Sequence, residues 1–269
     1  MKTIVVTGST RGIGFGLVQQ FLERGTNVVI CGRSQASVDK ALAKLQPQYG
    51  KRVIGQPCDV SDEAQVQALW DHAKDAFDSV DIWLNNAALI APREPLWEID
   101  AETLQNVINA NIIGSINGSN VAMRGMMVQG YGYIYNFKGL GSGGEAMRGN
   151  TAYGTTKAAI TYLHKALIKD RGDLPIKLGT VSPGIVTTDL LMNSLDPENM
   201  ARAKRFLNII ADRVETVTPW LAERILENER DNVYINWMPT SKLIGRFLMA
   251  PFRKRDVLGE ALAQETQHA

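Results

Sequence analysis

Six short apolar segments, each followed by a longer segment with helical spacing, restrict the fold of this 269-residue chain more than any other feature. They read TIVVTG, TNVVICG, RVIGQPCD, VDIWLNN, GYIYNF and IKLGTVSPG, and they lie between residues 3 and 184. Strands that alternate with helices of this length run parallel and are joined by right-handed crossovers, which place helices on both faces of the sheet. The chain is therefore predicted to be an α/β protein with a doubly wound, mostly parallel sheet.

The part of the chain after Gly184 has a looser pattern. Residues 186–229 read as two or three helices, and residues 231–238 (DNVYINWM) read as a last strand. No linker rich in Pro, Gly or Ser separates this part, and a hydrophobic content of 45% is enough for one sizeable core at this length. We expect one domain over residues 1–269, in which residues 187–269 form a substrate lid and C-terminal extension.

Charge and cysteine content exclude several classes of protein. The formal net charge of +1 argues against bulk attraction to nucleic acid. Cys31 and Cys58 are the only cysteines, so a disulfide framework is not expected and reduced thiols are the default. The N-terminus leads directly into a strand, without a signal or transit segment, and no apolar run approaches the roughly 20 residues of a membrane span. We expect a cytoplasmic protein of bacterial type, with no metal site.

A glycine-rich loop, TGSTRGIG, follows the first predicted strand and opens the first predicted helix. Gly8 allows a sharp turn, and Gly12 and Gly14 allow a pyrophosphate to approach closely. The helix N-terminus then offers N–H donors and positive dipole to phosphates. The alternative is a tight turn without a ligand; the place of the loop favours a nucleotide. The expected contacts are Gly8, Ser9, Thr10, Arg11, Gly12, Ile13 and Gly14.

The end of the second strand predicts which dinucleotide is bound. An NAD-selective site usually carries an acid there, and this chain has Gly32 followed by Arg33. Arg33, together with Arg11, fits a 2′-phosphate, so NADPH/NADP+ is the expected cofactor; solvated surface arginines are the alternative. Asp59 is expected to bond the adenine amino group, and Asn86 to lie beside the adenosine ribose. Ser34, Val60 and Ala87 flank these positions and complete this part of the predicted site.

Tyr153 and Lys157 lie four residues apart on a predicted helix and therefore share one face. A tyrosine ordinarily has a pKa of about 10. A nearby ammonium stabilises the phenolate and lowers that pKa, so the pair can act as a tuned acid and base. The spacing is common on ordinary helix surfaces, but here it opens the helix after the fifth strand and faces the predicted cofactor site.

The motifs TGSTRGIG, CDV, NNA, NIIG (Asn111 to Gly114), YxxxK and SPG (Ser182 to Gly184), in this order and spacing, resemble the short-chain dehydrogenase/reductase family over residues 1 to about 190. The resemblance implies a Rossmann-type sheet with strand order 3-2-1-4-5-6-7. It implies that Tyr153 protonates a carbonyl oxygen, that Lys157 bonds the nicotinamide ribose and that Asn111 holds a water in a proton relay. A helix kink with a bonded amide is the alternative for Asn111. The segment that wraps the nicotinamide is implied to include Pro183, Gly184, Val186 and Thr188.

The loop YNFKGLGSGG departs from the usual family pattern. Members usually carry a carbonyl-orienting serine three residues after the asparagine of the fifth strand. Counting from Asn136 gives Gly139, so that position lacks a hydroxyl. Ser142 is the nearest hydroxyl, and the loop glycines could let it fold back to the carbonyl. Two alternatives stay open: Ser142 as a catalytic residue and Ser142 as an ordinary loop residue.

Within the family, GYIYNFKGLGSGG, AYGTTK and VSPGIVTTDLLM most resemble the chlorophyll(ide) b reductases. This resemblance implies NADPH-dependent reduction of the C7 formyl group to hydroxymethyl. Lys138 differs from the branch, which is expected to carry an acid there. A reductase of another apolar aldehyde or ketone is the alternative, and a nucleotide-binding regulatory protein without catalysis is a third reading.

The substrate implied by that resemblance is a small apolar carbonyl compound. An apolar mouth is expected from Leu190, Leu191, Met192, Phe206, Leu207 and Ile210, although a lid-helix core is the more ordinary role of such residues. The tail LIGRFLMAPFRKR could lie on a membrane surface, including a photosynthetic membrane, or form a dimer-facing or lid helix. We also expect a homo-oligomer, either a dimer or a tetramer, and no nucleic-acid partner.

Overall fold

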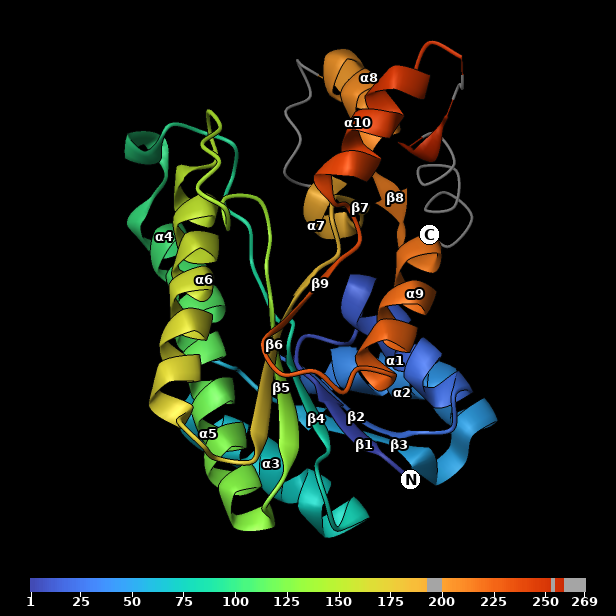
Figure 1. Cartoon of the computed structure of the whole chain (residues 1–269), viewed down its shortest axis with the longest axis vertical. Coiled ribbons are helices and arrows are strands. Elements are labelled where there is room, and N and C mark those ends of the chain that lie inside the picture. Colours follow the sequence, from blue (N-terminus) through green and yellow to red (C-terminus); the bar gives the residue numbers. More distant parts are fainter. Residues whose placement is uncertain (193–199, 253–254, 259–269) are drawn as a thin grey trace.

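The computed structural model describes residues 1–192, 200–252 and 255–258, and its centre is a sheet of seven parallel strands (Figure 1). The strand order is β3-β2-β1-β4-β5-β6-β9, which confirms the predicted order, with DNVYINWM supplying the last strand. The strands are β1 (Thr3–Val6), β2 (Asn27–Gly32), β3 (Val53–Pro57), β4 (Ile82–Asn85), β5 (Gly132–Phe137), β6 (Ile176–Ser182) and β9 (Val233–Asn236).

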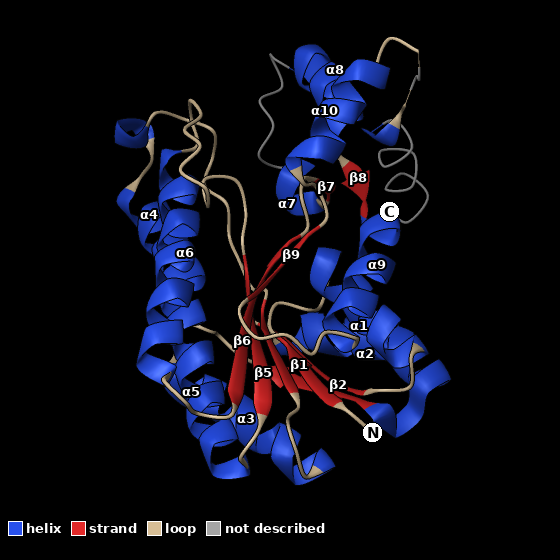
Figure 2. Cartoon of the chain, in the orientation of Figure 1, coloured by secondary structure: helices blue, strands red, loops and turns tan. Residues whose placement is uncertain are grey.

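Helices cover both faces of this sheet, as the alternating pattern predicts (Figure 2). On one face lie α1 (Gly12–Glu23), α2 (Gln35–Tyr49) and α9 (Val214–Leu226). On the other lie α3 (Glu63–Phe77), α5 (Gly114–Gln129) and α6 (Thr151–Arg171). The remaining helices of the described chain are α4 (Ala101–Ile108), α7 (Asp189–Met192), α8 (Met200–Ile210) and α10 (Thr240–Met249), with short turns at Gly50–Arg52 and Leu96–Glu98.

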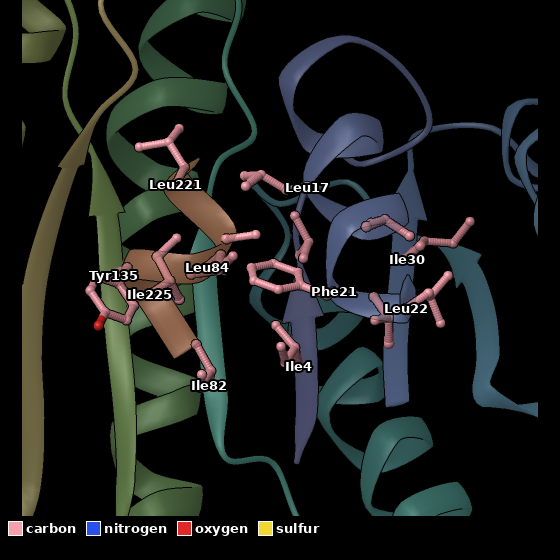
Figure 3. Close-up of a cluster of buried hydrophobic side chains, with 14 of the residues drawn as sticks. Ile4, Leu17, Phe21, Leu22, Ile30, Ile82, Leu84, Tyr135, Leu221 and Ile225 are labelled. Carbon is pink, nitrogen blue, oxygen red and sulfur yellow. The ribbon is translucent and has the colours of Figure 1, made fainter. Parts of the chain in front are cut away.

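The core on the α1 side explains why these helices stay in place. Phe21 of α1 is fully buried between the sheet and α9, where it lies near Ile4, Leu84 and Ile225 (Figure 3). Burying an aromatic or aliphatic side chain of this size contributes about 1.5–3 kcal/mol each. Apolar burial on both faces therefore fixes the sheet, and the sheet in turn fixes the loops at its carboxyl edge.

Two features of the chain depart from regular alternation of helices and strands. The first is a π-helical turn, Asn109–Ile113, between α4 and α5, which agrees with the helix kink given as the alternative for Asn111. Such turns widen a helix locally and occur often at functional sites. The second feature is a separate two-stranded parallel sheet, in which β7 (Val186–Thr187) pairs with β8 (Asp212–Arg213). Strands of two residues give no readable periodicity, so the sequence could not indicate them.

The carboxyl ends of the parallel strands meet at one edge, where ligands bind in open α/β sheets. The glycine loop follows β1 there, Asn86 follows β4, and Lys138 follows β5. In the described part of the chain no helix is long and apolar enough to cross a membrane. The assignment of residues 187–269 to a substrate lid stays a prediction.

Candidate active site

One cavity at the carboxyl edge of the sheet collects most of the residues that the sequence singles out. Its walls come from the glycine loop, the ends of β2, β3 and β4, the start of α6 and the segment after β6. The predicted residues that line it are Gly8, Thr10, Arg11, Gly12, Ile13, Gly14, Arg33, Asp59, Val60, Asn86, Ala87, Tyr153, Lys157, Pro183 and Thr188.

The glycine loop has the geometry that a dinucleotide requires. Gly8 and Gly12 have φ of +61° and +59°, a region that side chains rarely adopt. A Cβ at Gly14 would meet the Gly8 carbonyl at 2.5 Å, so this glycine permits close packing of helix on strand. The first turn of α1 borders the cavity with its N–H groups, which is where a pyrophosphate binds. The residues present therefore fit a dinucleotide cofactor.

Four predicted cofactor residues do not line the cavity. The buried Ser9 hydroxyl donates to the Val6 carbonyl at 2.6 Å and accepts from the Cys31 N–H at 3.0 Å, which ties the loop to β2. The Ser34 hydroxyl caps α2 by accepting from the Ser37 N–H. Gly184 packs against Trp237 and Met238, and Val186 is buried in the core of the α1 face. These residues shape the site from behind, and direct contact with the cofactor stays a prediction for them.

The end of β2 leaves no room for the acid of an NAD-selective site. A Cβ at Gly32 would lie 2.7 Å from Cγ2 of Thr10 and 2.9 Å from Oγ of Ser37. Arg33 is exposed at the cavity edge and has no ion pair among the described residues. Arg11 instead lies 3.8 Å from the carboxylate of Asp189, across the mouth of the cavity, where both side chains are more than half exposed. Both arginines border the cavity, and their contact with a 2′-phosphate stays a prediction.

The ends of β3 and β4 hold the remaining cofactor residues by short polar contacts. The Asp59 carboxylate accepts from the N–H and hydroxyl of Ser61 at 2.9 and 2.7 Å. Asn86 donates its side-chain amide to the carbonyls of Thr7 and Gly8, so it fixes the glycine loop as well as bordering the cavity. Asn85 is buried, and its side-chain amide donates hydrogen bonds to the Ser119 hydroxyl and to the side-chain oxygen of Asn136 on the neighbouring strand β5.

Tyr153 and Lys157 face the cavity from the first turns of α6. The Lys157 Nζ donates to the Phe137 carbonyl at 3.2 Å and lies 5.6 Å from the centre of the Tyr153 ring. Burial raises the pKa of Tyr153 to about 12 and lowers the pKa of Lys157 to about 8. The direction for Tyr153 differs from the sequence expectation, because its removal from water disfavours the charged phenolate. At neutral pH the tyrosine therefore carries its proton, as a proton donor must.

Asn111 lies in the π-helical turn, and its side-chain amide is fully bonded. It accepts from the Leu89 N–H at 2.7 Å and donates to the Leu89 carbonyl and to the Thr156 hydroxyl at 2.9 Å each. Thr156 in turn donates to the Tyr153 carbonyl at 2.7 Å. Asn111 therefore positions the turn of α6 that carries Tyr153, while its role in a water relay stays a prediction.

Ser142 is 9% exposed and does not line the cavity. Its hydroxyl accepts from the Gly139 N–H at 3.0 Å and donates to the Lys157 carbonyl at 3.1 Å. These bonds hold the loop against α6. Gly139, at the usual position of the serine, lies directly beside Tyr153, because a Cβ there would be 2.6 Å from the tyrosine hydroxyl. The direct role of Ser142 at the carbonyl stays a prediction, and its bonds indicate a positioning role.

The cavity is also lined by residues that were not among the predicted site residues: Gly32, Cys58, Ala88, Leu89, Ala110, Phe137, Lys138 and Asp189. Gly32 and Phe137 end β2 and β5, and Cys58 and Lys138 directly follow β3 and β5, so the rule that ligands lie at strand carboxyl ends could have found these four. The Lys138 Nζ lies 4.6 Å from the centre of the Tyr234 ring, and burial lowers the pKa of this lysine. Lys138 is thus a polar side chain that follows β5 and borders the cavity.

The apolar mouth stays a prediction, because the cavity lining includes none of Leu191, Met192, Phe206, Leu207 and Ile210. Leu207 and Ile210 are 4% and 5% exposed and pack inside the fold. Leu191 and Met192 pack against Leu207, whereas Phe206 is 45% exposed. The side chain of Leu190 lies outside the described residues.

Residues 2–199 match the family described as short chain dehydrogenase. The chain is 37% identical over 227 residues to "Chlorophyll(ide) b reductase NOL, chloroplastic" of Arabidopsis thaliana, covering 82% of this chain and 64% of that protein. It is 35% identical to a 3alpha-hydroxysteroid dehydrogenase of Mediterraneibacter gnavus, covering 71% and 76%. A solved structure, "ElxO with NADP Bound", has a TM-score of 0.74 at 25% identity and covers 87% of this chain and 96% of the other.

The chain belongs to the short-chain dehydrogenase family. Within that family it resembles the chlorophyll(ide) b reductases. It spans less than two thirds of the length of the Arabidopsis relative. The name of that relative describes it as chloroplastic, and this location does not match the expectation of a bacterial-type cytoplasmic protein.

Proposed function

We propose that this chain reduces the C7 formyl group of chlorophyll(ide) b to hydroxymethyl, with NADPH as the hydride donor. The observation that carries a carbonyl reduction is the position of Tyr153 beside Lys157 in a cavity that also fits a dinucleotide. The similarity to chlorophyll(ide) b reductases supports the choice of substrate.

NADPH is supported by the chemistry of the β2 end. An acid cannot stand at Gly32 without displacing Thr10 or Ser37, whereas Arg33 is exposed and lies at the cavity edge. A guanidinium can bind a phosphate through two parallel N–H donors, and this geometry favours a 2′-phosphate over a 2′-hydroxyl.

The bound nicotinamide supplies the hydride, and the chain supplies the proton and the geometry. Tyr153 holds its proton at neutral pH and donates it to the carbonyl oxygen as negative charge develops there. Lys157 is mostly charged below pH 8, so its ammonium stabilises the phenolate that remains. Asn111 and Thr156 hold the backbone of the Tyr153 turn, so the hydroxyl keeps its direction.

The group that orients the carbonyl differs from the usual family serine. Ser142 bonds Gly139 and Lys157 and so fixes the loop, while Lys138 borders the cavity. A Lys138 ammonium can donate to a carbonyl oxygen, and Ser142 contributes by holding the loop that ends beside Tyr153.

A second candidate is the reduction of another apolar aldehyde or ketone. It is favoured by the 35% identity to a 3alpha-hydroxysteroid dehydrogenase, whose printed name refers to a bulky apolar alcohol. A regulatory protein without catalysis is disfavoured, because Tyr153 and Lys157 meet in one cavity with the cofactor loop.

The deciding experiment follows NADPH oxidation with chlorophyllide b, a 3-ketosteroid and simple aldehydes as substrates. The proposal predicts the highest kcat/KM for chlorophyllide b, with a hydroxymethyl product. A preference for the ketosteroid would favour the second candidate. Sedimentation of the same preparation tests the expected dimer or tetramer, and cell fractionation tests the expected cytoplasmic location.

A further inference from the structure

The C-terminal part of the described chain carries a surface that neither the cofactor cavity nor the core uses. We propose that α8, α10 and the residues up to Phe252 form a docking surface for an anionic lipid bilayer. This inference is independent of the proposed substrate, because it rests on apolar exposure and charge outside the active site. We call it the α8–α10 surface.

The apolar half of the α8–α10 surface is a helix face without a partner in the described chain. α10 has no buried residue. Ile244, Phe247 and Leu248 are 55%, 44% and 69% exposed and share one face of α10, and Phe252 just beyond it is 84% exposed. Phe206 of α8 extends this face, since its ring centre lies 6.2 Å from that of Phe247. Several large apolar side chains together in water mark an interaction site.

The polar half of the surface carries an excess of positive charge. A second cavity, between α8 and α10, is bordered by the apolar side chains of Ile209 and Met249. Its charged lining residues are Lys204, Arg205, Lys242, Arg246, Arg255 and Asp256. Asp212 lies behind it and pairs with Arg246 and Arg255, and Lys204 lies 3.8 Å from the Asp256 carboxylate. Five cations therefore meet two carboxylates at this place, an excess of three positive charges. The cavity therefore attracts anions beside an apolar face.

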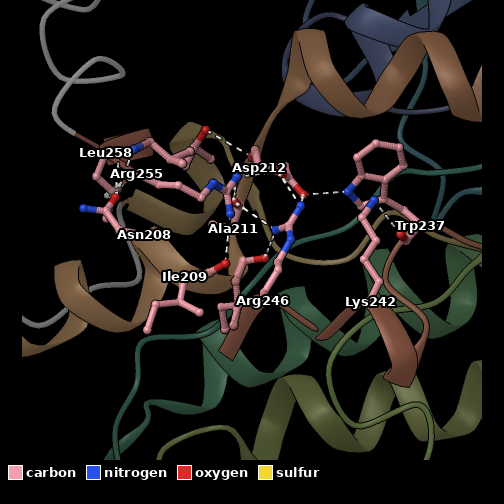
Figure 4. A network of polar contacts seen from close by, with 12 residues as sticks. Asn208, Ile209, Ala211, Asp212, Trp237, Lys242, Arg246, Arg255 and Leu258 are labelled. Carbon is pink, nitrogen blue, oxygen red and sulfur yellow. Dashed lines mark hydrogen bonds and ion pairs between the residues drawn. The ribbon is translucent and has the colours of Figure 1, made fainter. Parts of the chain in front are cut away.

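A buried anion holds this surface in place. Asp212 is 2% exposed, and it accepts from Arg246 at 2.7 and 2.9 Å, from Arg255 at 2.7 Å and from Nε1 of Trp237 at 2.6 Å (Figure 4). Lys242 donates to the Trp237 carbonyl at 3.1 Å. The same arginines bond the carbonyls of Ile209, Ile210 and Ala211 at the end of α8. α10 is thus fixed mainly by charge, and among the described residues its apolar face is covered only at Phe247, by Phe206.

Charge decides between an anionic bilayer and a second copy of the chain. A symmetric dimer would place this surface against itself, so its excess cations would face the same cations. An anionic bilayer offers phosphate groups to the lysines and arginines and acyl chains to the apolar side chains. The occupant that satisfies both halves of the surface is therefore anionic lipid.

The experiment measures binding of the full chain to vesicles by co-sedimentation. Vesicles of phosphatidylglycerol with phosphatidylcholine are compared with vesicles of phosphatidylcholine alone, at low and high salt. We expect binding to the anionic vesicles only, weakened by salt because the cations are near the surface. Arg205→Ala should weaken the partition coefficient about fivefold, the effect of one cation at an anionic surface.

Leu248→Asp with Phe252→Asp should weaken binding by about tenfold or more, because the apolar contact is lost. Val128→Asp is the matched control, since Val128 is 92% exposed on α5 and lies outside the α8–α10 surface. This variant should bind anionic vesicles as the unchanged chain does. The rate of NADPH oxidation with a water-soluble aldehyde should be the same for the unchanged chain, the double variant and Val128→Asp. An unchanged rate shows that the variants are folded and that the loss of vesicle binding is independent of the proposed reaction.

Several results would overturn the inference. One is the absence of binding to anionic vesicles at low salt, and another is equal binding by the Leu248→Asp, Phe252→Asp protein. A chain that self-associates through this surface, so that the double variant becomes monomeric while vesicle binding is absent, would identify a second copy as the occupant. Binding of an acidic protein but not of lipid would equally refute it.

Discussion

Gly139 is the position at which the loop after β5 comes closest to the predicted proton donor, Tyr153. A Cβ at this residue would lie 2.6 Å from the Tyr153 hydroxyl and 3.3 Å from Cε of Lys157. The backbone of Gly139 is outside the positive-φ region, so alanine is allowed there apart from these contacts. Gly139→Ala therefore tests the approach of the loop to the proton donor and little else.

The magnitude follows from the contact. An ordinary Cβ contact is at least 3.4 Å, so the hydroxyl must retreat by about 0.8 Å from its present 2.6 Å. A misplacement of about 1 Å at the reacting atoms can cost about 100-fold in rate. We expect kcat to fall roughly 10- to 100-fold, with a loss of about 1–3 kcal/mol of unfolding free energy from the forced contact.

The assay is steady-state NADPH oxidation with the best substrate, together with NADPH binding by fluorescence and urea unfolding. NADPH affinity should change little, because Gly139 does not line the cofactor cavity. Gly245→Ala is the control, since a Cβ there meets nothing within 4 Å. In a Tyr153→Phe background the hydroxyl is absent, so Gly139→Ala should cost less stability there. Unchanged kcat and unchanged stability of the single variant would refute the loop position.

Three further predictions concern the same cavity. Ser142→Ala should cost about 1–3 kcal/mol of unfolding free energy, because it removes the partner of the Gly139 N–H. A loss of kcat below tenfold would fit a positioning role for Ser142. A loss of about 1000-fold at unchanged stability, on the order of a lost oxyanion donor, would show instead that Ser142 is catalytic. Arg33→Ala should raise the KM for NADPH about 10- to 100-fold and leave the KM for NADH nearly constant; equal changes would contradict the 2′-phosphate assignment. The kcat/KM for reduction should fall as pH rises through about 8, where Lys157 loses its proton, because the pKa of Tyr153 at about 12 keeps the donor protonated; in Lys157→Arg this limb should vanish from any residual rate, since arginine stays charged.

The sequence predicts those parts of the site that depend on local structure. The glycine loop opens a helix, and Tyr153 and Lys157 share a helix face, so spacing alone places them. Their meeting in one cavity follows from the parallel sheet, whose strand ends share one edge. The order of the strands, including the last one, was predictable from the family resemblance, because a parallel pattern alone is compatible with several orders.

The remaining parts depend on contacts between segments far apart in the chain. Nothing in the sequence near Ser142 shows that its hydroxyl bonds the Lys157 carbonyl, 15 residues away. Asp212 gathers Arg246 and Arg255 from 34 and 43 residues further on. The amide of Asn111 is occupied by Leu89 and Thr156, which come from two other segments. Such partners are chosen by packing and by the need to pair buried polar groups, and spacing does not reveal them.

The most direct test of the account is the product formed from chlorophyllide b and NADPH by the unchanged chain and by Tyr153→Phe. The account predicts that the unchanged chain converts the C7 formyl group to hydroxymethyl with one NADPH oxidised per product. It predicts that Tyr153→Phe forms less product by several orders of magnitude while binding NADPH with nearly the same affinity. Reduction at the same rate by Tyr153→Phe, or no reduction of the formyl group by the unchanged chain, would contradict it.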